Sequence, residues 1–305
     1  MKRSSERITE RLNPASASLH EESTREILRR INREDHKVAP AVLRVIPKIA
    51  RAVDISVAAV AQGGRVVYCG AGSSGRLGIL DAAECVPTFG TDRFQAVMAG
   101  APRAMFRPSE ISEDDPHQAI RDLRRIAFSR RDVLVGISAS GRTPYTLGGM
   151  RYARRLGART VGLTSNPEAP LRKLADVAIV PIVGPEIIAG SSRLKAGTAQ
   201  KLVLNMLSTA TMVRLGRSFA GWMINLQMNN RKLRERGLRI LMKAAGVSAA
   251  RAASALELSG RNLPVALLIL WKNVTRSQAQ RLLKCNCGAV LHEAWADHSR
   301  ASRRH

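Results

Sequence analysis

The chain has 305 residues, and its 49 Lys and Arg against 24 Asp and Glu give a formal net charge of +25. This length can bury a sizeable core, so we expect one large domain and a smaller one. The sequence has no run of 18 apolar residues and no apolar signal core, which excludes a membrane span or secretory signal and predicts a cytoplasmic protein. Four cysteines indicate reduced thiols and no disulfide framework.

The excess of Arg has two interpretations. A basic surface of this size attracts polyanions weakly whatever the function. Aromatic residues make up only 4% of the chain, which leaves few platforms for stacking single-stranded nucleic acid. Arg clusters at 121–131, 151–159 and 231–239 lie beside apolar residues, often at helical spacing. We interpret them mostly as solvated helix faces and expect no specific nucleic-acid binding.

The first 55 residues are expected to form an arm and helices. Residues 7–20 contain Pro and Ser and are expected to be extended, which by itself suits a frayed terminus. Ser23 is suited to cap one helix. Pro40 is suited to begin a second, longer helix that Pro47 could kink.

Two apolar strand patterns each end in a loop rich in small and hydroxyl residues. Strand 65–69 precedes Gly-Ala-Gly-Ser-Ser-Gly-Arg at 70–76, and strand 132–137 precedes Ser-Ala-Ser-Gly-Arg-Thr-Pro at 138–144. In an open parallel sheet, ligands bind beyond the carboxyl ends of the strands, so these loops can converge. They fit neither the dinucleotide nor the triphosphate fingerprint well. Hydroxyls in place of further glycines favour a phosphate monoester.

A third stretch, Gly-Ser-Ser-Arg-Leu-Lys-Ala-Gly-Thr-Ala-Gln-Lys at 190–201, opens an apolar helical pattern. Ser next to Gly suits a helix start, where free N–H groups and the helix dipole attract anions. An ordinary helix cap can have the same sequence, but the two similar loops upstream favour phosphate binding. The helix expected over 192–215 is apolar on most faces, which indicates a buried core or a dimer interface.

The alternation of strands and helices predicts an α/β fold with a parallel sheet flanked by helices. Further helices are expected over 218–241 and within 240–285. A Cys-x-Cys pair near the C-terminus lacks the usual zinc spacing, so no metal is expected. The expected organisation is an N-terminal arm and helices (1–55), an α/β domain that carries the phosphate loops (56–220), a helical domain (221–285) and a basic, disordered tail (286–305).

Acidic residues follow the first loop. Asp81 and Glu84 stand in an apolar helical run, where burial would raise a carboxyl pKa and leave a proton to donate near neutral pH. A salt bridge to Arg76 or a surface position is the alternative. A second acidic cluster at 110–115 precedes a helix and could simply cap it.

These loops resemble the sugar-isomerase (SIS) domain and, more narrowly, the N-acetylmuramic acid 6-phosphate etherase family. The narrower resemblance rests on Leu-Gly-Ile-Leu-Asp-Ala-Ala-Glu-Cys at 77–85, Ala-Ser-Gly-Arg-Thr-Pro-Tyr at 139–145 and the stretch 184–209, and it covers about residues 7–280. It implies an SIS-type αβα sandwich with a small all-helical C-terminal domain, and a homodimer that acts on a small sugar phosphate.

The resemblance also implies a reaction and its residues. The D-lactyl ether of N-acetylmuramic acid 6-phosphate would be cleaved to N-acetylglucosamine 6-phosphate and D-lactate, with no cofactor. Glu84 falls at the family's proton donor and Glu113 at its second catalytic Glu, although which is acid and which is base stays open. Lys195 or Arg193 would neutralise charge. The hydroxyl candidates for phosphate and sugar binding are Ser73, Ser74, Ser138, Ser140, Thr143, Ser191 and Ser192.

The chain departs from the family pattern at two places. Ala-Pro-Arg at 101–103 replaces a Gly-Gly-Glu-like string, and Asn225 replaces an Asp. The Thr-Glu pair at Thr9 and Glu10 and the Asn-x-Lys-Leu-like string at 230–233 follow it. The Thr-Glu pair implies an N-terminal arm that lies over the site, as the alternative to a frayed terminus. Three alternatives remain open: a non-catalytic sugar-phosphate regulator, a sugar-phosphate isomerase and a polyanion-binding accessory protein.

Overall fold

The computed structural model describes residues 8–107, 110–226, 228 and 231–302. The chain forms two compact units, unit 1 (Met1–Ala83 with Arg93–Ser208) and unit 2 (Glu84–Asp92 with Thr209–His305). The chain passes from one unit to the other at three points: after Ala83, inside α4 (Gly72–Phe89); after Asp92, in the loop that follows α4; and after Ser208, inside α8 (Lys195–Arg214). The domain boundary after residue 220 stays a prediction, and it lies further along the chain than the last of these points.

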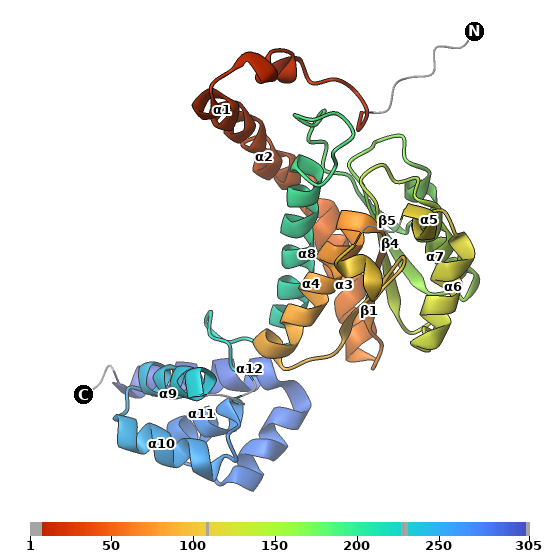
Figure 1. Cartoon of the computed structure of the whole chain (residues 1–305). Coiled ribbons are helices and arrows are strands. Elements are labelled where there is room, and N and C mark those ends of the chain that lie inside the picture. Colours follow the sequence, from red (N-terminus) through yellow and green to blue (C-terminus); the bar gives the residue numbers. More distant parts are fainter. Residues whose placement is uncertain (1–7, 108–109, 227, 229–230, 303–305) are drawn as a thin grey trace. The chain divides into compact units, whose positions relative to one another are not determined.

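Unit 1 is built on a five-stranded parallel sheet with the order β2-β1-β3-β4-β5 (Figure 1). β1 and β3 are buried along their whole length, as their continuous apolar runs predict. Gly70, which ends β1, pairs with Ile137, which ends β3, so the two loops leave one edge of the sheet together. This confirms the predicted fold class. The strands are β1 (Val66–Gly70), β2 (Phe94–Met98), β3 (Val133–Ile137), β4 (Arg159–Leu163) and β5 (Val177–Ile179).

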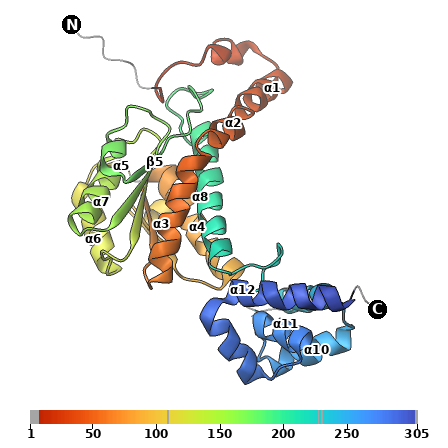
Figure 2. The ribbon, with the colours of Figure 1, turned by 180° about the vertical axis from the view of Figure 1, so that it is seen from behind.

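Helices cover both faces of this sheet (Figures 1 and 2). On one face, Leu134 of β3 shares a buried cluster with Leu123 of α6 (Pro116–Arg125) and Met150 of α7 (Pro144–Arg155). The other face carries α3 (Ile46–Ala61), which contacts β1, β3 and β5. α4 lies on the same face of the sheet as α3 (Figures 1 and 2). Short helical segments lie in the connections between the strands and the longer helices. These are η3 (Arg103–Met105), α5 (Glu110–Glu113) and η4 (Pro170–Leu174).

The N-terminal arm contains two short turns, η1 (Pro14–Ser16) and η2 (Leu19–Glu21), before α1 (Thr24–Asp35). The Ser23 side chain accepts a hydrogen bond from the Glu26 N–H, so the predicted cap is confirmed. The long helix expected from Pro40 is divided into α2 (Val38–Leu43) and α3. Pro47 lies in the first turn of α3, where a missing N–H costs nothing.

At the amino edge of the sheet, Arg65 and Asp132 tie β1 to β3. The Arg65 N–H donates to Asp132 Oδ1 at 2.9 Å, and Arg65 Nη2 lies 2.9 Å from Asp132 Oδ2. The same guanidinium donates to the carbonyls of Ile126 and Ala127 at 2.9 and 3.0 Å. Burial raises the pKa of Asp132, but hydrogen bonds from Arg65 and the Ser129 N–H outweigh this and hold the pKa below its usual range.

In unit 2, the helices α9 to α12 surround an apolar core that includes Leu241, Leu267 and Leu291. Residues 218–226 form a loop with a Phe219–Trp222 bridge, so the helix expected over 218–241 is wrong over 218–226. The disordered tail expected over 286–305 is wrong as far as residue 302, because buried Leu291 and Ala294 anchor a helix that continues to Ser302; residues 303–305 lie outside the described part of the chain. The helices are α9 (Arg231–Ala245), α10 (Ala249–Leu258), α11 (Leu263–Lys272) and α12 (Arg276–Ser302).

Within the described ranges, no single helix has the length and apolar character needed to cross a membrane. α10 and α11 reach the threshold only when taken together, and they are bent by 117° at their junction. Most of α11 is buried in the core of unit 2. The resemblance of residues 230–233 to a family string rests partly on Asn230, which lies outside the described residues.

Candidate sugar-phosphate site

A polar pocket of about 350 Å³ lies where β1 and β3 end. All of its lining residues belong to unit 1. It unites the two loops with the start of the third stretch, as their positions after parallel strands predicted. The lining residues are Thr9, Glu10, Ala71, Gly72, Ser73, Ser74, Arg76, Glu113, Ser138, Ala139, Ser140, Thr143, Gly190 and Ser192.

The loop after β1 opens directly into α4, whose positive dipole end therefore lies at the pocket. Gly72 has a φ of +52°, and a Cβ there would lie 2.9 Å from Oε1 of Glu113. A glycine thus lets the Glu113 carboxylate approach the loop. Ser74 is buried and donates to Gln200 Oε1 at 3.0 Å, which joins this loop to α8.

The loop after β3 holds a small hydroxyl network. Ser138 Oγ lies 2.9 Å from Thr143 Oγ1 and 3.4 Å from Ser140 Oγ. It also accepts the Gly141 N–H at 3.0 Å. Each hydroxyl can both donate and accept, so the network can rearrange around the oxygens of a phosphate or a sugar.

The N-terminal arm lines the same pocket. The Gly190 N–H donates to the Thr9 carbonyl at 3.0 Å, and Thr9 Oγ1 donates to Glu10 Oε1 at 3.1 Å. Of the two alternatives for the arm, the structure has the one in which it lies over the site. It also adds Glu10, a second carboxylate in the pocket beside Glu113, which the sequence reasoning had not named as a site residue.

Lys195 was expected to neutralise the charge of a ligand, but it does not line this pocket. Its side chain is 2% exposed, its Nζ pairs with Glu34 of α1, and the same Nζ donates to the Pro185 carbonyl at 2.6 Å. A buried ammonium needs such partners because desolvation without them is costly. Asn13 also donates to Glu34 Oε2 and to the Pro185 carbonyl, at 2.9 and 3.0 Å.

These hydrogen bonds set the ionisation of Glu34. Burial raises its pKa, but hydrogen bonds from Lys195, Lys37 and Asn13 lower it to about 2. Nearby, Glu186 caps α8 by accepting the N–H groups of Lys195 and Ala196 at 3.0 and 2.9 Å. This cap explains why the helix begins at Lys195 and not at residue 192.

Arg76 supplies a cation to the pocket. Its Nε donates to the Met105 carbonyl at 3.0 Å and its Nη2 to the Ala104 carbonyl at 2.7 Å. The loop that departs from the family pattern at 101–103 therefore leads into the turn that holds this guanidinium. The salt bridge weighed as an alternative for Asp81 or Glu84 is not the arrangement adopted, because Arg76 is oriented by backbone carbonyls.

Asp81 is buried as expected, whereas Glu84 is not. Asp81 is buried, accepting the Tyr68 hydroxyl at 2.8 Å and lying 3.5 Å from Lys201 Nζ. Glu84 is exposed, belongs to unit 2, and is not among the lining residues of the pocket. The inference that the apolar run buries a carboxylate therefore holds for Asp81 and is wrong for Glu84. Ser191 also lies outside the lining set.

The second departure from the family pattern has a local explanation in unit 2. The Asn225 side-chain amide donates to the Arg217 carbonyl at 3.1 Å. An ionised Asp could not make this bond, because a carboxylate only accepts. The amide thus stabilises the loop before α9 in a way that the acid would not.

A parallel sheet with hydroxyl-lined loops at its carboxyl edge defines an SIS-type sugar-phosphate protein. Residues 115–210 match the SIS domain family, and residues 48–154 match the N-terminal SIS domain of glucokinase regulatory protein. A solved structure from Bacteroides fragilis, assigned as a phosphosugar isomerase involved in capsule formation, shares the fold with a TM-score of 0.51. It is 20% identical and covers 70% of this chain and 97% of its own.

Relatives that match over most of the chain identify the family within this class of proteins. N-acetylmuramic acid 6-phosphate etherase of Edwardsiella ictaluri is 53% identical over 285 residues, 93% of this chain and 95% of the relative. The etherase of Histophilus somni is 47% identical over 281 residues, 92% and 93% of the two chains. The chain belongs to the N-acetylmuramic acid 6-phosphate etherase family.

Proposed function

We infer that this chain is an etherase that cleaves the D-lactyl ether of N-acetylmuramic acid 6-phosphate, giving N-acetylglucosamine 6-phosphate and D-lactate. The observation that carries this inference is the 53% identity to an etherase over 93% of the chain. The isomerase alternative is supported by a shared fold alone, and one fold hosts many reactions. A charged sugar phosphate does not cross a bilayer unaided, so we also propose a cytoplasmic location.

We propose that the phosphate binds among the hydroxyls of Ser73, Ser138, Ser140, Thr143 and Ser192. The start of α4 contributes its dipole, and Arg76 contributes a full positive charge. Lys195 acts through Glu34, holding the arm and the start of α8 in place. The pocket volume of about 350 Å³ falls in the range of small-ligand sites.

Ether cleavage needs two proton transfers. A base removes the proton on sugar C2, the bond from C3 to the lactyl oxygen breaks, and an acid protonates that oxygen as it leaves. Water then adds across the resulting double bond, so the sugar regains a hydroxyl at C3. Two carboxyl groups can perform these steps when their pKa values differ. We propose Glu113, which lines the pocket, as one partner and Glu84, by family position, as the other.

The decisive test is D-lactate release from N-acetylmuramic acid 6-phosphate by the wild type, Glu84→Gln and Glu113→Gln. We expect each substitution to lower kcat by about 10²- to 10⁴-fold while binding of the sugar phosphate is retained. Glu10→Gln is the matched comparison, and there we expect KM to rise more than kcat falls. If Glu10→Gln abolishes turnover and Glu84→Gln does not, Glu10 takes the role proposed for Glu84. Binding without release by the wild type would indicate a regulator.

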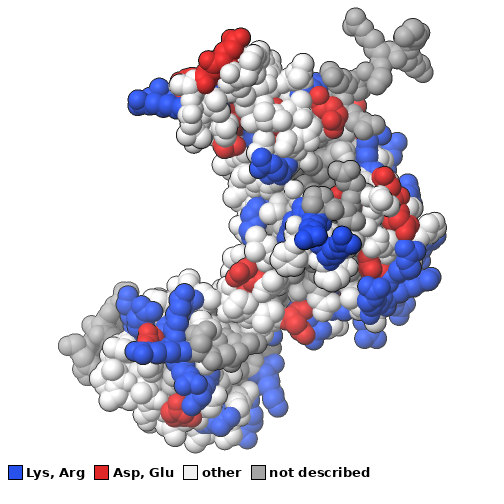
Figure 3. Space-filling view, in the orientation of Figure 1, with Lys and Arg blue, Asp and Glu red and all other residues white. Residues whose placement is uncertain are grey.

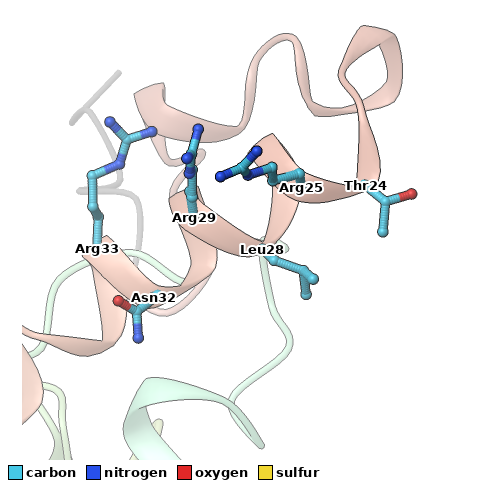
Figure 4. A pocket seen from close by; sticks show the side chains of 6 residues that line it. All are labelled: Thr24, Arg25, Leu28, Arg29, Asn32 and Arg33. Carbon is cyan, nitrogen blue, oxygen red and sulfur yellow. The ribbon is translucent and has the colours of Figure 1, made fainter.

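We also propose a homodimer whose interface includes the apolar face of α1 and α2. Leu28 of α1 is 60% exposed and Leu43 of α2 is 65% exposed. Leucine side chains usually lie in a core, so burying these two in an interface would be favourable. In the view of Figure 4, Leu28 and Asn32 point away from α1 in a different direction from Arg29 and Arg33, and all four residues line a hollow of about 700 Å³. Sedimentation should show a dimer that Leu28→Glu with Leu43→Glu converts to monomer; a wild-type monomer at micromolar concentration would contradict the proposal.

A further inference from the structure

A second concave site lies wholly within unit 2. It has a volume of about 370 Å³ and is lined by Trp222, Met223, Arg236, Arg239, Ile240 and Lys243, together with one glycine. None of these residues belongs to the pocket of unit 1. Nothing in the etherase reaction derived above uses them.

The three cations of this site share one face of α9. Their spacing of three and four residues places Arg236, Arg239 and Lys243 above one another on the helix. In the part of the chain that the structure describes, no carboxylate forms an ion pair with any of them. Elsewhere on the same helix, Arg231 pairs with Glu235 at 2.8 Å. Like charges at such spacing repel one another, so an anion bound among them would be stabilised.

The opposite wall of the site is apolar and held in place. Residues Phe219 and Trp222 exchange two backbone hydrogen bonds of 3.1 and 2.7 Å, which fix the loop that carries the indole. The Phe219 ring packs 5.5 Å from the Trp271 ring in the core. Lys243 Nζ lies 6.0 Å from the centre of the Trp222 ring, and Arg236 Nη1 lies 3.6 Å from Met223 Sδ. The cations therefore border an aromatic face.

We propose that this is a binding site for a small phosphate monoester with a planar or apolar body. Arg236 and Arg239 present planar donor sets that suit phosphate oxygens, and Lys243 adds a third positive charge. The body of the ligand lies against Trp222 and Ile240. Figure 3 shows Lys and Arg gathered on the face of unit 2 that carries α9, which steers anions toward the site.

The arrangement favours a small ligand over nucleic acid. The site is a single cavity with one aromatic side chain, whereas single strands are bound by successive aromatic platforms along a basic groove. AMP is a suitable probe because it combines a phosphate monoester with a planar base. Inorganic phosphate tests the anion alone, and a short single-stranded oligonucleotide tests the polymer.

Tryptophan fluorescence can report on this site selectively. The three tryptophans, Trp222, Trp271 and Trp295, all belong to unit 2, and the pocket of unit 1 contains none. We expect AMP to change the fluorescence saturably, with inorganic phosphate binding more weakly. Arg236→Gln with Arg239→Gln should weaken AMP binding by about ten-fold or more.

The matched control is Arg151→Gln with Arg155→Gln, which removes two exposed charges from α7 and should leave the AMP affinity unchanged. Equal weakening by both double variants would overturn the proposal, since it would show a general effect of charge. Absence of saturation at millimolar AMP, or displacement of AMP by far tighter oligonucleotide binding, would also overturn it. Arg239→Gln alone, at an exposed position, should retain the fold and give a smaller loss of affinity.

Discussion

The amino and carboxyl edges of the unit 1 sheet are both polar, yet their polar groups are used differently. At the amino edge, Arg65 and Asp132 bond to each other and to the neighbouring backbone, so their polar groups serve the fold. At the carboxyl edge, the hydroxyls of Ser138, Ser140 and Thr143 bond among themselves and border a cavity. The comparison teaches that a site is marked by hydrogen-bonding capacity left facing a cavity, and not by polarity alone.

The largest expected effect comes from removing the Arg65–Asp132 ion pair at the amino edge of the sheet. Asp132→Ala leaves the mostly buried Arg65 guanidinium without its carboxylate, which should lower the free energy of unfolding by about 3–5 kcal/mol. Urea denaturation measures this loss. The KM of the folded fraction for N-acetylmuramic acid 6-phosphate should stay within about two-fold of wild type, because a stability effect of this kind does not alter substrate contacts. A large rise in KM would show that the amino edge also affects substrate binding, which would contradict the distinction between the two edges.

Glu34 sharpens the comparison because its carboxylate, like that of Asp132, is engaged by partners within the fold, which are Asn13, Lys37 and Lys195. Its pKa falls from 4.5 to about 2 on folding, so its ionised form contributes about 3 kcal/mol of stability that Glu34→Gln should remove at pH 7. The folded pKa is the lower one, so this contribution is complete above pH 4.5 and is lost as the pH falls towards 2. Denaturation at pH 7 and pH 3 should therefore show a smaller difference between variant and wild type at pH 3.

The control for that experiment is on the same helix. Glu26 pairs with Arg33 at 2.7 Å but is partly exposed, so Glu26→Gln should cost under about 1 kcal/mol at either pH. A pH-independent loss in Glu34→Gln would show that packing, and not ionisation, accounts for its effect. Because Glu34 holds Lys195 and, through Asn13, the arm, a rise in KM should accompany the loss of stability.

These regions also show how far the sequence could predict the structure. The parallel sheet and the meeting of two hydroxyl loops follow from local patterns, since strand and loop signals lie within a few residues. The role of Lys195 does not, because its partner Glu34 lies 161 positions away and no local pattern joins them. The exposure of Glu84 depends on which face of α4 packs inward, and Asp81 occupies that face. The reach of α12 depends on a core that residues 286–302 help to form.

The smallest expected effects come from single hydroxyls, one at each edge. The contacts of the Ser140 hydroxyl with Ser138 Oγ, at 3.4 Å, and with the Arg142 N–H, at 3.3 Å, are long, so Ser140→Ala should change the free energy of unfolding by under about 0.5 kcal/mol. The KM of this variant should rise about three- to ten-fold, which corresponds to the loss of one hydrogen bond to the substrate.

Thr160 is the matching hydroxyl near the amino edge, where it is the second residue of β4 and donates to the Leu174 carbonyl at 3.0 Å. Thr160→Val should lose about 1 kcal/mol of stability with KM unchanged. If both variants lose stability and neither alters KM, the hydroxyls of the carboxyl edge serve the fold, and the phosphate must bind elsewhere in the pocket.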